Sequence, residues 1–411
     1  MLAEIITIGD ELLLGQVINT NSSWIGNRIS ALGIKVQRIT TVGDNREEIL
    51  KILSESQQRS QFVFISGGLG PTSDDITKPV LCEYFNTTLV FNESVYENAL
   101  SVLSKRGAVM NELNRNQALV PASAKIVEND IGTAPGLWMV KDNVNFIALP
   151  GVPFEMESII NNRIVPAIKE KFKLQFNYHK TVLTTGIGES KLAIQISDWE
   201  NKLPDSIKLA YLPSPGMVKL RLSGYGHTII KNIVEKEIIK LEAILGNAIF
   251  GYDNDTLETI VGRNLAANHQ TLSTAESCTG GNIARMITSV PGSSEYFLGS
   301  IIAYSNDIKS EFLEVSKEFI QQYGAVSQQV AESMSKGIMK KFNSDYSIGV
   351  TGIAGPSGGT ADKPVGTTWI AVSSGHQTIS EKFLFGDNRE RNIIRSSFAA
   401  LNMLRKMLIS N

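Results

Sequence analysis

Short apolar runs alternate with amphipathic segments through residues 1–171, and this pattern restricts the possible folds most strongly. Apolar runs at 3–8, 62–65 and 144–149 predict buried strands, and segment 35–42 also has a strand pattern. Segments 19–32 and 45–59 have helical spacing and begin with cap residues, so they predict helices, and a further helix is expected at 157–171. Repeated strand–helix units predict a mostly parallel sheet covered by helices on both faces, which is a doubly wound α/β domain.

Size and composition indicate a soluble globular protein of several domains. The chain has 411 residues, of which 42% are hydrophobic and 19% charged. The 39 basic and 41 acidic residues leave a net charge of −2, which argues against a nucleic-acid partner. The sequence enters a strand pattern at once and has no long apolar run, so we expect a cytoplasmic protein without a membrane span. Its two cysteines and four histidines have no zinc-like spacing.

Three domains are expected, with boundaries at 1–171, 172–255 and 256–411. In the middle segment, short strand patterns at 209–212 and 217–222 precede a helical pattern at 229–245. That combination predicts a small α+β module, and no catalytic cluster is visible in it. The last segment returns to alternating strand and helix patterns, including an apolar strand at 299–304, and predicts a second α/β domain.

Three loops of the first domain follow predicted strands, where open parallel sheets bind their ligands. They comprise residues 9–15, 67–75 and 150–153. Glycines in the second loop can leave backbone N–H groups free for phosphates, so we predict a ligand site containing Gly67, Gly68, Gly70, Asn19 and Gly151.

Acidic residues in the same loops predict a site for a divalent cation such as Mg²⁺. Carboxylates are hard oxygen ligands for a cation that bridges a diphosphate. The predicted ligands are Asp74 and Asp75, together with Asp10 or Glu11. The alternative is that Asp74 and Asp75 only stabilise the start of the helix expected near 77–85.

The stretch 274–281 of the last domain combines a strand end, two glycines and the start of a helical pattern. Ser277 is therefore expected on a strand-to-helix turn that Gly280 and Gly281 allow to be tight. Free N–H groups there, from Cys278 and Thr279 to Gly281, could bind a phosphate or a developing oxyanion. The alternative is that Ser277 or Thr279 is simply the N-cap of the helix.

A serine nucleophile needs a base, and none of the four histidines falls in a glycine-rich loop. Lysine is the natural substitute, and Lys309 follows Tyr304 by five residues, in a loop where a partly buried amine would have a lowered pKa. Each has an ordinary alternative: Lys309 as a solvated lysine and Tyr304 as a core residue. Cys278 is the rival nucleophile.

Further candidates for substrate binding lie later in the last domain. Thr351 precedes a glycine-rich loop at 352–359 that contains Gly352, Gly355 and Gly358, and this loop could hold a phosphate or line a pocket. Arg389 could bind a phosphate or carboxylate, or it could be a surface arginine at the start of the last helix.

These motifs together resemble those of a known family. The three N-terminal loops resemble the MoaB/MoeA-like molybdopterin-binding domain, in the version found in the competence/damage-inducible CinA family. The middle module matches that family's KH-like domain in position, but it lacks a basic Gly-x-x-Gly loop, so we expect a spacer or dimerisation module. The 274–281 turn, Tyr304-Ser305-Asn306 with Lys309, and segments 352–359 and 363–367 resemble a nicotinamide-nucleotide amidohydrolase domain.

The resemblance implies a bifunctional enzyme of pyridine-nucleotide salvage. In the last domain, Ser277 would be the nucleophile, with Tyr304 and Lys309 activating it, and nicotinamide mononucleotide would be deamidated without a cofactor. The first domain would bind a pterin or nucleotide diphosphate with a divalent metal, and in some relatives it hydrolyses ADP-ribose. Asn388 interrupts the family's Gly-Asp-Arg motif, so Arg389, Arg391 and Arg395 all remain candidates for its arginine.

The expected assembly is a homodimer, and two other functional classes stay open. One is a non-catalytic protein that binds a pterin or nucleotide and is linked to competence or DNA damage. The other is a DNA-uptake or recombination factor, against which the near-neutral charge argues.

Overall fold

The computed structural model describes all residues except 73, 173, 175, 227 and 411, so Ser73 of the predicted glycine-rich loop lies outside it. The chain divides into two compact units: residues 1–178 with 224–231, and residues 179–223 with 232–411. The boundary predicted near 255 falls inside the second unit, and the division into three domains stays a prediction. Among the described residues, no helix has both the length and the apolar character needed to cross a bilayer.

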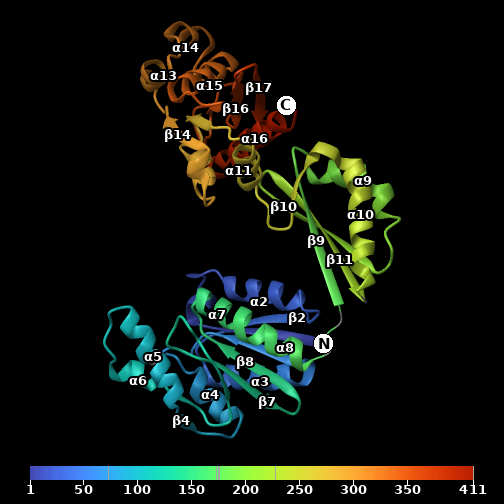
Figure 1. The fold of residues 1–411 in the computed structure, drawn as a ribbon, viewed down its shortest axis with the longest axis vertical. Coiled ribbons are helices and arrows are strands. Elements are labelled where there is room, and N and C mark those ends of the chain that lie inside the picture. Colours follow the sequence, from blue (N-terminus) through green and yellow to red (C-terminus); the bar gives the residue numbers. More distant parts are fainter. Residues whose placement is uncertain (73, 173, 175, 227, 411) are drawn as a thin grey trace. The chain divides into compact units, whose positions relative to one another are not determined.

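The first unit is built on a six-stranded sheet with the order β2-β1-β3-β8-β7-β6 (Figure 1). The first four strands are parallel, β7 runs antiparallel to β8, and β6 runs antiparallel to β7. Their bounds are β1 Leu2–Ile8, β2 Lys35–Val42, β3 Phe62–Ser66, β6 Lys125–Val127, β7 Gly136–Lys141 and β8 Val144–Leu149. A separate antiparallel pair consists of β4 (Leu89–Phe91) and β5 (Leu119–Pro121).

Helices cover both faces of this sheet, as the apolar alternation predicts. Ile5 and Phe64 point to a core shared with α2 and α7, whereas Ile6 and Ile65 point to a core shared with α3 and α4. The doubly wound architecture is therefore confirmed. The helices are α1 Asp10–Leu13, α2 Thr20–Ser30, α3 Arg46–Arg59, α4 Thr77–Tyr84, α5 Glu93–Lys105, α6 Glu112–Asn116, α7 Pro153–Ile159 and α8 Val165–Lys171.

One helix differs from its prediction. The segment expected to be helical from residue 157 already begins at Pro153, because proline fits the first turn of a helix, where its missing N–H is not needed. A π-helical turn at Ile160–Ile164 separates α7 from α8.

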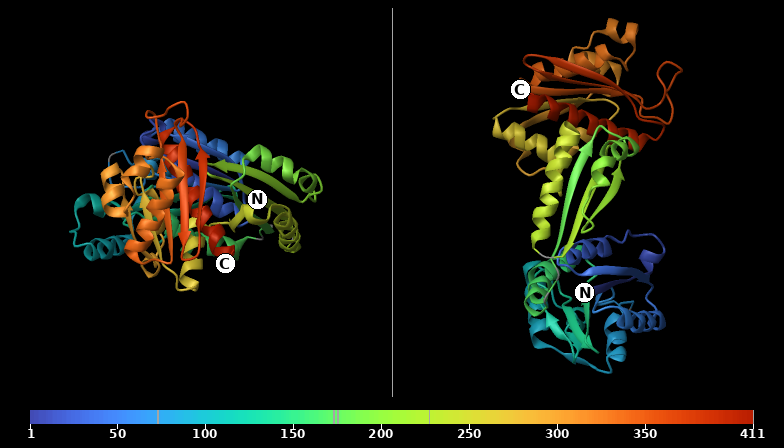
Figure 2. Two further views of the ribbon diagram at one scale, coloured as in Figure 1. Left: turned by 90° about the horizontal axis from the view of Figure 1, so that it is seen from above. Right: turned by 90° about the vertical axis from the view of Figure 1, so that its right-hand side faces the viewer.

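The middle module has a four-stranded sheet with the order β10-β11-β9-β12. Its strands are β9 Phe176–Thr185, β10 Ile207–Ser214, β11 Met217–Gly226 and β12 Ile249–Tyr252. Helices α9 (Glu189–Glu200) and α10 (Ile229–Leu245) contact each other, since Nε1 of Trp199 donates to the carboxylate of Glu237 at 3.1 Å; Figure 2 gives two further views of the ribbon. A 3-10 turn at Gly246–Ala248 leads into β12.

The last domain contains a five-stranded sheet with the order β14-β13-β15-β16-β17. Strand β13 lies between β14 and β15 and is parallel to both, β16 runs antiparallel to β15, and β17 runs antiparallel to β16. The strands are β13 Leu272–Glu276, β14 Phe297–Ile302, β15 Tyr346–Gly352, β16 Thr367–Ser374 and β17 Thr378–Leu384. The helices are α11 Leu257–Ala267, α12 Asn282–Thr288, α13 Asn306–Leu313, α14 Lys317–Tyr323, α15 Gln328–Phe342 and α16 Arg389–Ser410, with a 3-10 turn at Ser293–Glu295.

The register of this sheet places three loops together. Glu276, the last residue of β13, pairs with Ile302 of β14 on one side and with Val350 of β15 on the other. Because the three strands are parallel, the chain after each of them leaves the same edge of the sheet. The strand predicted at 299–304 ends at Ile302, so Tyr304 lies beyond it.

Candidate active site

Ser277 lies on the turn between β13 and α12, and its side chain is 7% exposed. Its N–H donates to the carbonyl of Val350 at 3.0 Å, and its own carbonyl accepts from the N–H of Gly280 at 3.2 Å. The N-cap of α12 is Gly281, with φ of 94°, and no side chain caps it from that position. The alternative that Ser277 or Thr279 is the N-cap is therefore wrong.

The start of α12 is occupied by a carboxylate of the protein itself. Glu276 is fully buried and accepts hydrogen bonds from the N–H groups of Gly281 (3.0 Å), Ile283 (3.1 Å) and Ala284 (2.8 Å). The prediction of a helix start open to a ligand needs correction, because Gly280 and Gly281 use their N–H groups within the protein. In the described part of the chain, the N–H groups of Cys278 and Thr279 have no protein acceptor.

Lys309 contacts the hydroxyl of Ser277 directly. Its Nζ lies 3.1 Å from Ser277 Oγ, 2.8 Å from the carbonyl oxygen of Ala303 and 3.3 Å from that of Tyr304. Lys309 is on helix α13, not in a loop as predicted, and it is 2% exposed. Burial disfavours the charged amine and lowers the pKa of Lys309. The alternative of a solvated lysine is wrong.

The hydroxyl of Tyr304 is hydrogen-bonded to an arginine, and the described residues show no hydrogen bond between it and Ser277. Tyr304 is 61% exposed, so the alternative of a core residue is wrong. Its hydroxyl accepts a hydrogen bond from Nη2 of Arg389 at 3.0 Å, and Nη1 of Arg389 donates to the carbonyl of Gly355 at 2.8 Å. Of the other two candidate arginines, Arg395 donates to the carbonyl of Phe385, and Arg391 is an exposed residue of the first turn of α16. The structure thus brings Arg389 to the site.

Cys278 packs into the wall behind the turn. A Cβ atom on Gly352 would lie 2.9 Å from Cys278 Sγ, so only glycine fits there without displacing the thiol. Burial, with the nearby carboxylate of Glu276, raises the pKa of Cys278 to about 12. A thiol with so high a pKa is almost entirely protonated at neutral pH and is a poor nucleophile.

Of the other predicted substrate-binding residues, two are threonines with buried hydroxyls and two are glycines of the loop at 352–359. The hydroxyl of Thr351 is buried and donates to the carbonyl of Ala325 at 2.8 Å, which braces the end of β15. Thr279 has a buried hydroxyl with no partner among the described residues. Gly355 and Gly358 both have φ near 90°, a left-handed conformation that glycine adopts without strain.

A second candidate site lies in the first unit, at the carboxyl ends of β1, β3 and β8. It is a cavity of about 390 Å³ whose lining includes the five predicted ligand residues, Asn19, Gly67, Gly68, Gly70 and Gly151. The N–H groups of Gly68 and Leu69 have no protein acceptor within the described ranges. The side chain of Asn19 bonds within the protein. Its Oδ1 accepts from the N–H of Ser22 and caps α2, and its Nδ2 donates to the hydroxyls of Thr7 and Thr41.

The four predicted metal ligands do not come together as a preformed site. Asp75 turns back on its own loop and accepts from the N–H groups of Gly70 and Thr72 and from the Thr72 hydroxyl, at 2.8, 2.9 and 2.6 Å. Within the described residues, no group of three or more acidic, cysteine or histidine side chains is close enough to hold a metal ion. The predicted metal remains a prediction.

Sequence reasoning missed two residues near this cavity. Asp44 exchanges backbone-to-carboxylate hydrogen bonds with Asp10, and burial together with Asp10, Glu11 and Asp74 raises its pKa. Lys78 on α4 is 7% exposed and lies near the carbonyls of Gln117 and Leu119; burial lowers its pKa to about 8. The sequence feature that could have identified Lys78 is its position as the one lysine of a largely apolar helix at 77–84.

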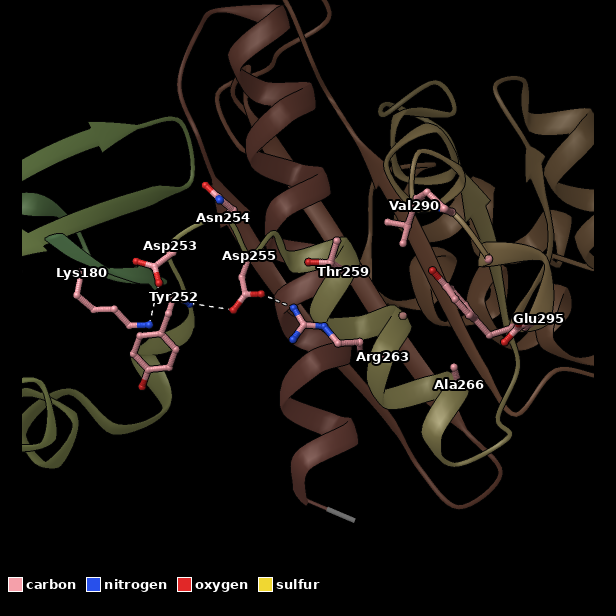
Figure 3. A pocket seen from close by; sticks show the side chains of 14 residues that line it. Lys180, Tyr252, Asp253, Asn254, Asp255, Thr259, Arg263, Ala266, Val290 and Glu295 are labelled. Atoms are coloured by element: carbon pink, nitrogen blue, oxygen red, sulfur yellow. Dashed lines mark hydrogen bonds and ion pairs between the residues drawn. The ribbon is translucent and has the colours of Figure 1, made fainter. Parts of the chain in front are cut away.

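Another cavity, of about 750 Å³, lies in the second unit, between the middle module and α11 (Figure 3). Both of its basic side chains are paired: Lys180 with Asp253 at 2.7 Å, and Arg263 with Asp255. Because both basic side chains that line the cavity are held in ion pairs, the turn at Ser277 with its buried amine is the stronger candidate for chemistry.

Comparisons with known proteins match every part of the chain. Family models match residues 4–186 as a probable molybdopterin binding domain, 179–251 as a damage-inducible protein CinA KH domain and 254–408 as a CinA C-terminal domain. A CinA-like protein from Flavobacterium psychrophilum is 46% identical over 417 residues, covering 100% of this chain and 99% of that protein. A putative competence-damage inducible protein from Caldicellulosiruptor saccharolyticus is 41% identical over 412 residues, covering all of both.

A solved structure also resembles part of the chain. It is the protein CinA with unknown function from Thermoplasma acidophilum, at 34% identity and a TM-score of 0.37. The likeness covers 41% of this chain and 96% of that one.

Proposed function

Because the chain belongs to the CinA family, we propose that its last domain hydrolyses the carboxamide of nicotinamide mononucleotide to nicotinic acid mononucleotide and ammonia. The observation that supports this proposal most is the 3.1 Å contact between Lys309 Nζ and Ser277 Oγ. A buried amine beside a hydroxyl is the arrangement of a serine nucleophile with a lysine base.

The surroundings of Lys309 suit the neutral form of the amine. A neutral amine has two N–H groups and one lone pair. The carbonyls of Ala303 and Tyr304 accept the two N–H groups, which leaves the lone pair for the hydroxyl proton of Ser277. Lys309 would therefore act as the general base in the first step and return the proton to the leaving ammonia.

The reaction would then proceed through an acyl-enzyme. Ser277 Oγ attacks the carboxamide carbon, and the oxygen that gains negative charge is bound by the free N–H groups of Cys278 and Thr279. Ammonia leaves, and a water molecule activated by Lys309 hydrolyses the ester and releases the acid. Arg389, held beside the site by Gly355 and Tyr304, is the cation available for the substrate's phosphate.

Two alanine variants test the assignment of the nucleophile. We expect Ser277→Ala to abolish ammonia release from nicotinamide mononucleotide, because no other hydroxyl contacts Lys309 in the described structure. Cys278→Ala should keep most of the activity, since the thiol is buried against Gly352 at the end of β15. Ammonia release measured for both variants decides the question: loss of activity in the cysteine variant alone would make Cys278 the nucleophile.

For the first domain we propose a binding site for a diphosphate ligand such as ADP-ribose. The cavity, the free N–H groups of Gly68 and Leu69, and the match to a probable molybdopterin binding domain support this. A cation that arrives with a diphosphate needs only one or two protein carboxylates, and Asp10 and Asp44 could provide them. The cation would neutralise charge on the phosphates.

Two variants separate the two sites. With nicotinamide mononucleotide and ADP-ribose as substrates, we expect Ser277→Ala to silence only ammonia release and Asp44→Asn to silence only a Mg²⁺-dependent hydrolysis of ADP-ribose. Asp74→Ala, at the rim of the same cavity, should weaken the second activity as well. Binding of ADP-ribose without turnover in the wild type would instead favour a non-catalytic nucleotide- or pterin-binding domain.

A further inference from the structure

We propose that Glu276 is the positioning residue of the catalytic turn: its carboxylate holds Ser277 against Lys309 and keeps two N–H groups free for the oxyanion. The inference rests on the proposed amide hydrolysis and assigns a role to a residue that does not touch the substrate.

Glu276 is anchored at both of its ends. Its backbone lies in β13, where it pairs with β14 and β15 and accepts from the N–H of Ala303 at 2.8 Å. Its side chain is fully buried, and both carboxylate oxygens bind the start of α12. A negative charge at a helix N-terminus, bound by several N–H groups, is a strong and directional contact.

This double anchoring closes a short loop that contains the nucleophile. Residues 277–280 run from the backbone of Glu276 to Gly281, whose N–H binds the same residue's carboxylate. Within the loop, the N–H groups of Ser277 and Gly280 are fixed by Val350 and Ser277. The remaining N–H groups, those of Cys278 and Thr279, are the ones without a protein acceptor in the described chain.

The carboxylate also excludes a competing arrangement. Free N–H groups at a helix start attract anions such as a phosphate. With Glu276 in place, the N–H groups of Ile283 and Ala284 are taken, and Arg389 remains as the partner for phosphate.

The variant Glu276→Gln tests this role with little change of shape. An amide has a single acceptor oxygen, and its NH₂ group would face N–H donors, so the start of α12 would shift. A misplaced nucleophile and oxyanion site should reduce kcat by about 100-fold, while KM for nicotinamide mononucleotide stays within about twofold because Arg389 is unaffected.

A matched control is Asp345→Asn in the same domain. Asp345 also braces backbone, since it accepts from the N–H and hydroxyl of Thr271 at 2.7 Å each, but at the opposite end of β13 and β15. If Glu276 were only a structural cap, both variants would lower the melting temperature, and their kcat values would be the same. Equal kcat values for the two variants at equal loss of stability would overturn the proposal.

A second measurement does not depend on the substrate. A fluorophosphonate probe labels an activated serine, and its rate with wild type and Glu276→Gln can be followed over pH. We expect the labelling rate of the variant to reach a lower plateau at high pH. The pH at which the rate is half-maximal should stay the same, because Glu276 does not contact Lys309. A shifted midpoint with an equal plateau would contradict a positioning role, and so would failure of the wild type to be labelled. If the wild type is labelled but releases no ammonia, the proposed function fails and the labelling rates still decide the role of Glu276.

Discussion

Lys309 shows how far burial changes the chemistry of one side chain. At 2% exposure its amine is removed from the water that stabilises the charged form, and this burial favours the neutral amine. The same residue type on a surface would be protonated at all physiological pH values.

The lowered pKa of Lys309 predicts the pH dependence of ammonia release. Only the neutral amine can accept the Ser277 proton, so kcat should rise with pH and reach half its plateau below 10.5, the ordinary lysine value. In Lys309→Arg the guanidinium stays charged, so kcat for ammonia release should fall by about 100-fold or more. The exposed Lys340→Arg is the control, and a wild-type rate that does not change with pH would exclude Lys309 as the base.

Lys78 predicts a pH dependence of stability. Its pKa is lowered to about 8 in the folded protein and returns to the ordinary value on unfolding, so the unfolded chain binds more protons between these values. Stability relative to Lys78→Met should therefore increase by about 3 kcal/mol from pH 7 to pH 10.5. Urea unfolding of both proteins across this range measures the difference, and a difference that is constant with pH would show that Lys78 is not buried.

At the scale of elements, the site depends on the contact between the end of β15 and the turn after β13. Gly352 makes this contact possible, since a Cβ there would lie 2.7 Å from the Thr368 hydroxyl and 2.9 Å from Cys278 Sγ. Sequence reasoning assigned Gly352 to substrate binding, whereas the structure shows that it also allows two elements to pack closely.

Gly352→Ala should therefore affect both stability and catalysis. Overpacking at this contact should lower the free energy of unfolding by about 1–3 kcal/mol, and displacement of the turn should lower kcat. Gly375→Ala is the control, because a Cβ at Gly375 meets nothing within 4 Å. Denaturation and ammonia release measured in parallel check this, and a fully active, fully stable Gly352→Ala would contradict the packing argument.

The whole molecule consists of two compact units, each with its own candidate site. Units with separate cores commonly unfold separately, so calorimetry should resolve two transitions. ADP-ribose should raise the transition of the first unit, and nicotinamide mononucleotide added to Ser277→Ala should raise that of the second. If both ligands raise the same transition, the two sites do not lie in separate units as proposed.

The sequence alone determined the strands at 35–42 and 144–149, the doubly wound first sheet and the turn that carries Ser277, because periodicity and caps act between near neighbours in the chain. Only the tertiary structure decided that Lys309 reaches Ser277 across 32 positions, that Glu276 fills the helix start, and that Asp44 instead of Asp75 joins Asp10. Those outcomes depend on which loops meet at a sheet edge and on where water is excluded. Neither is encoded in local spacing.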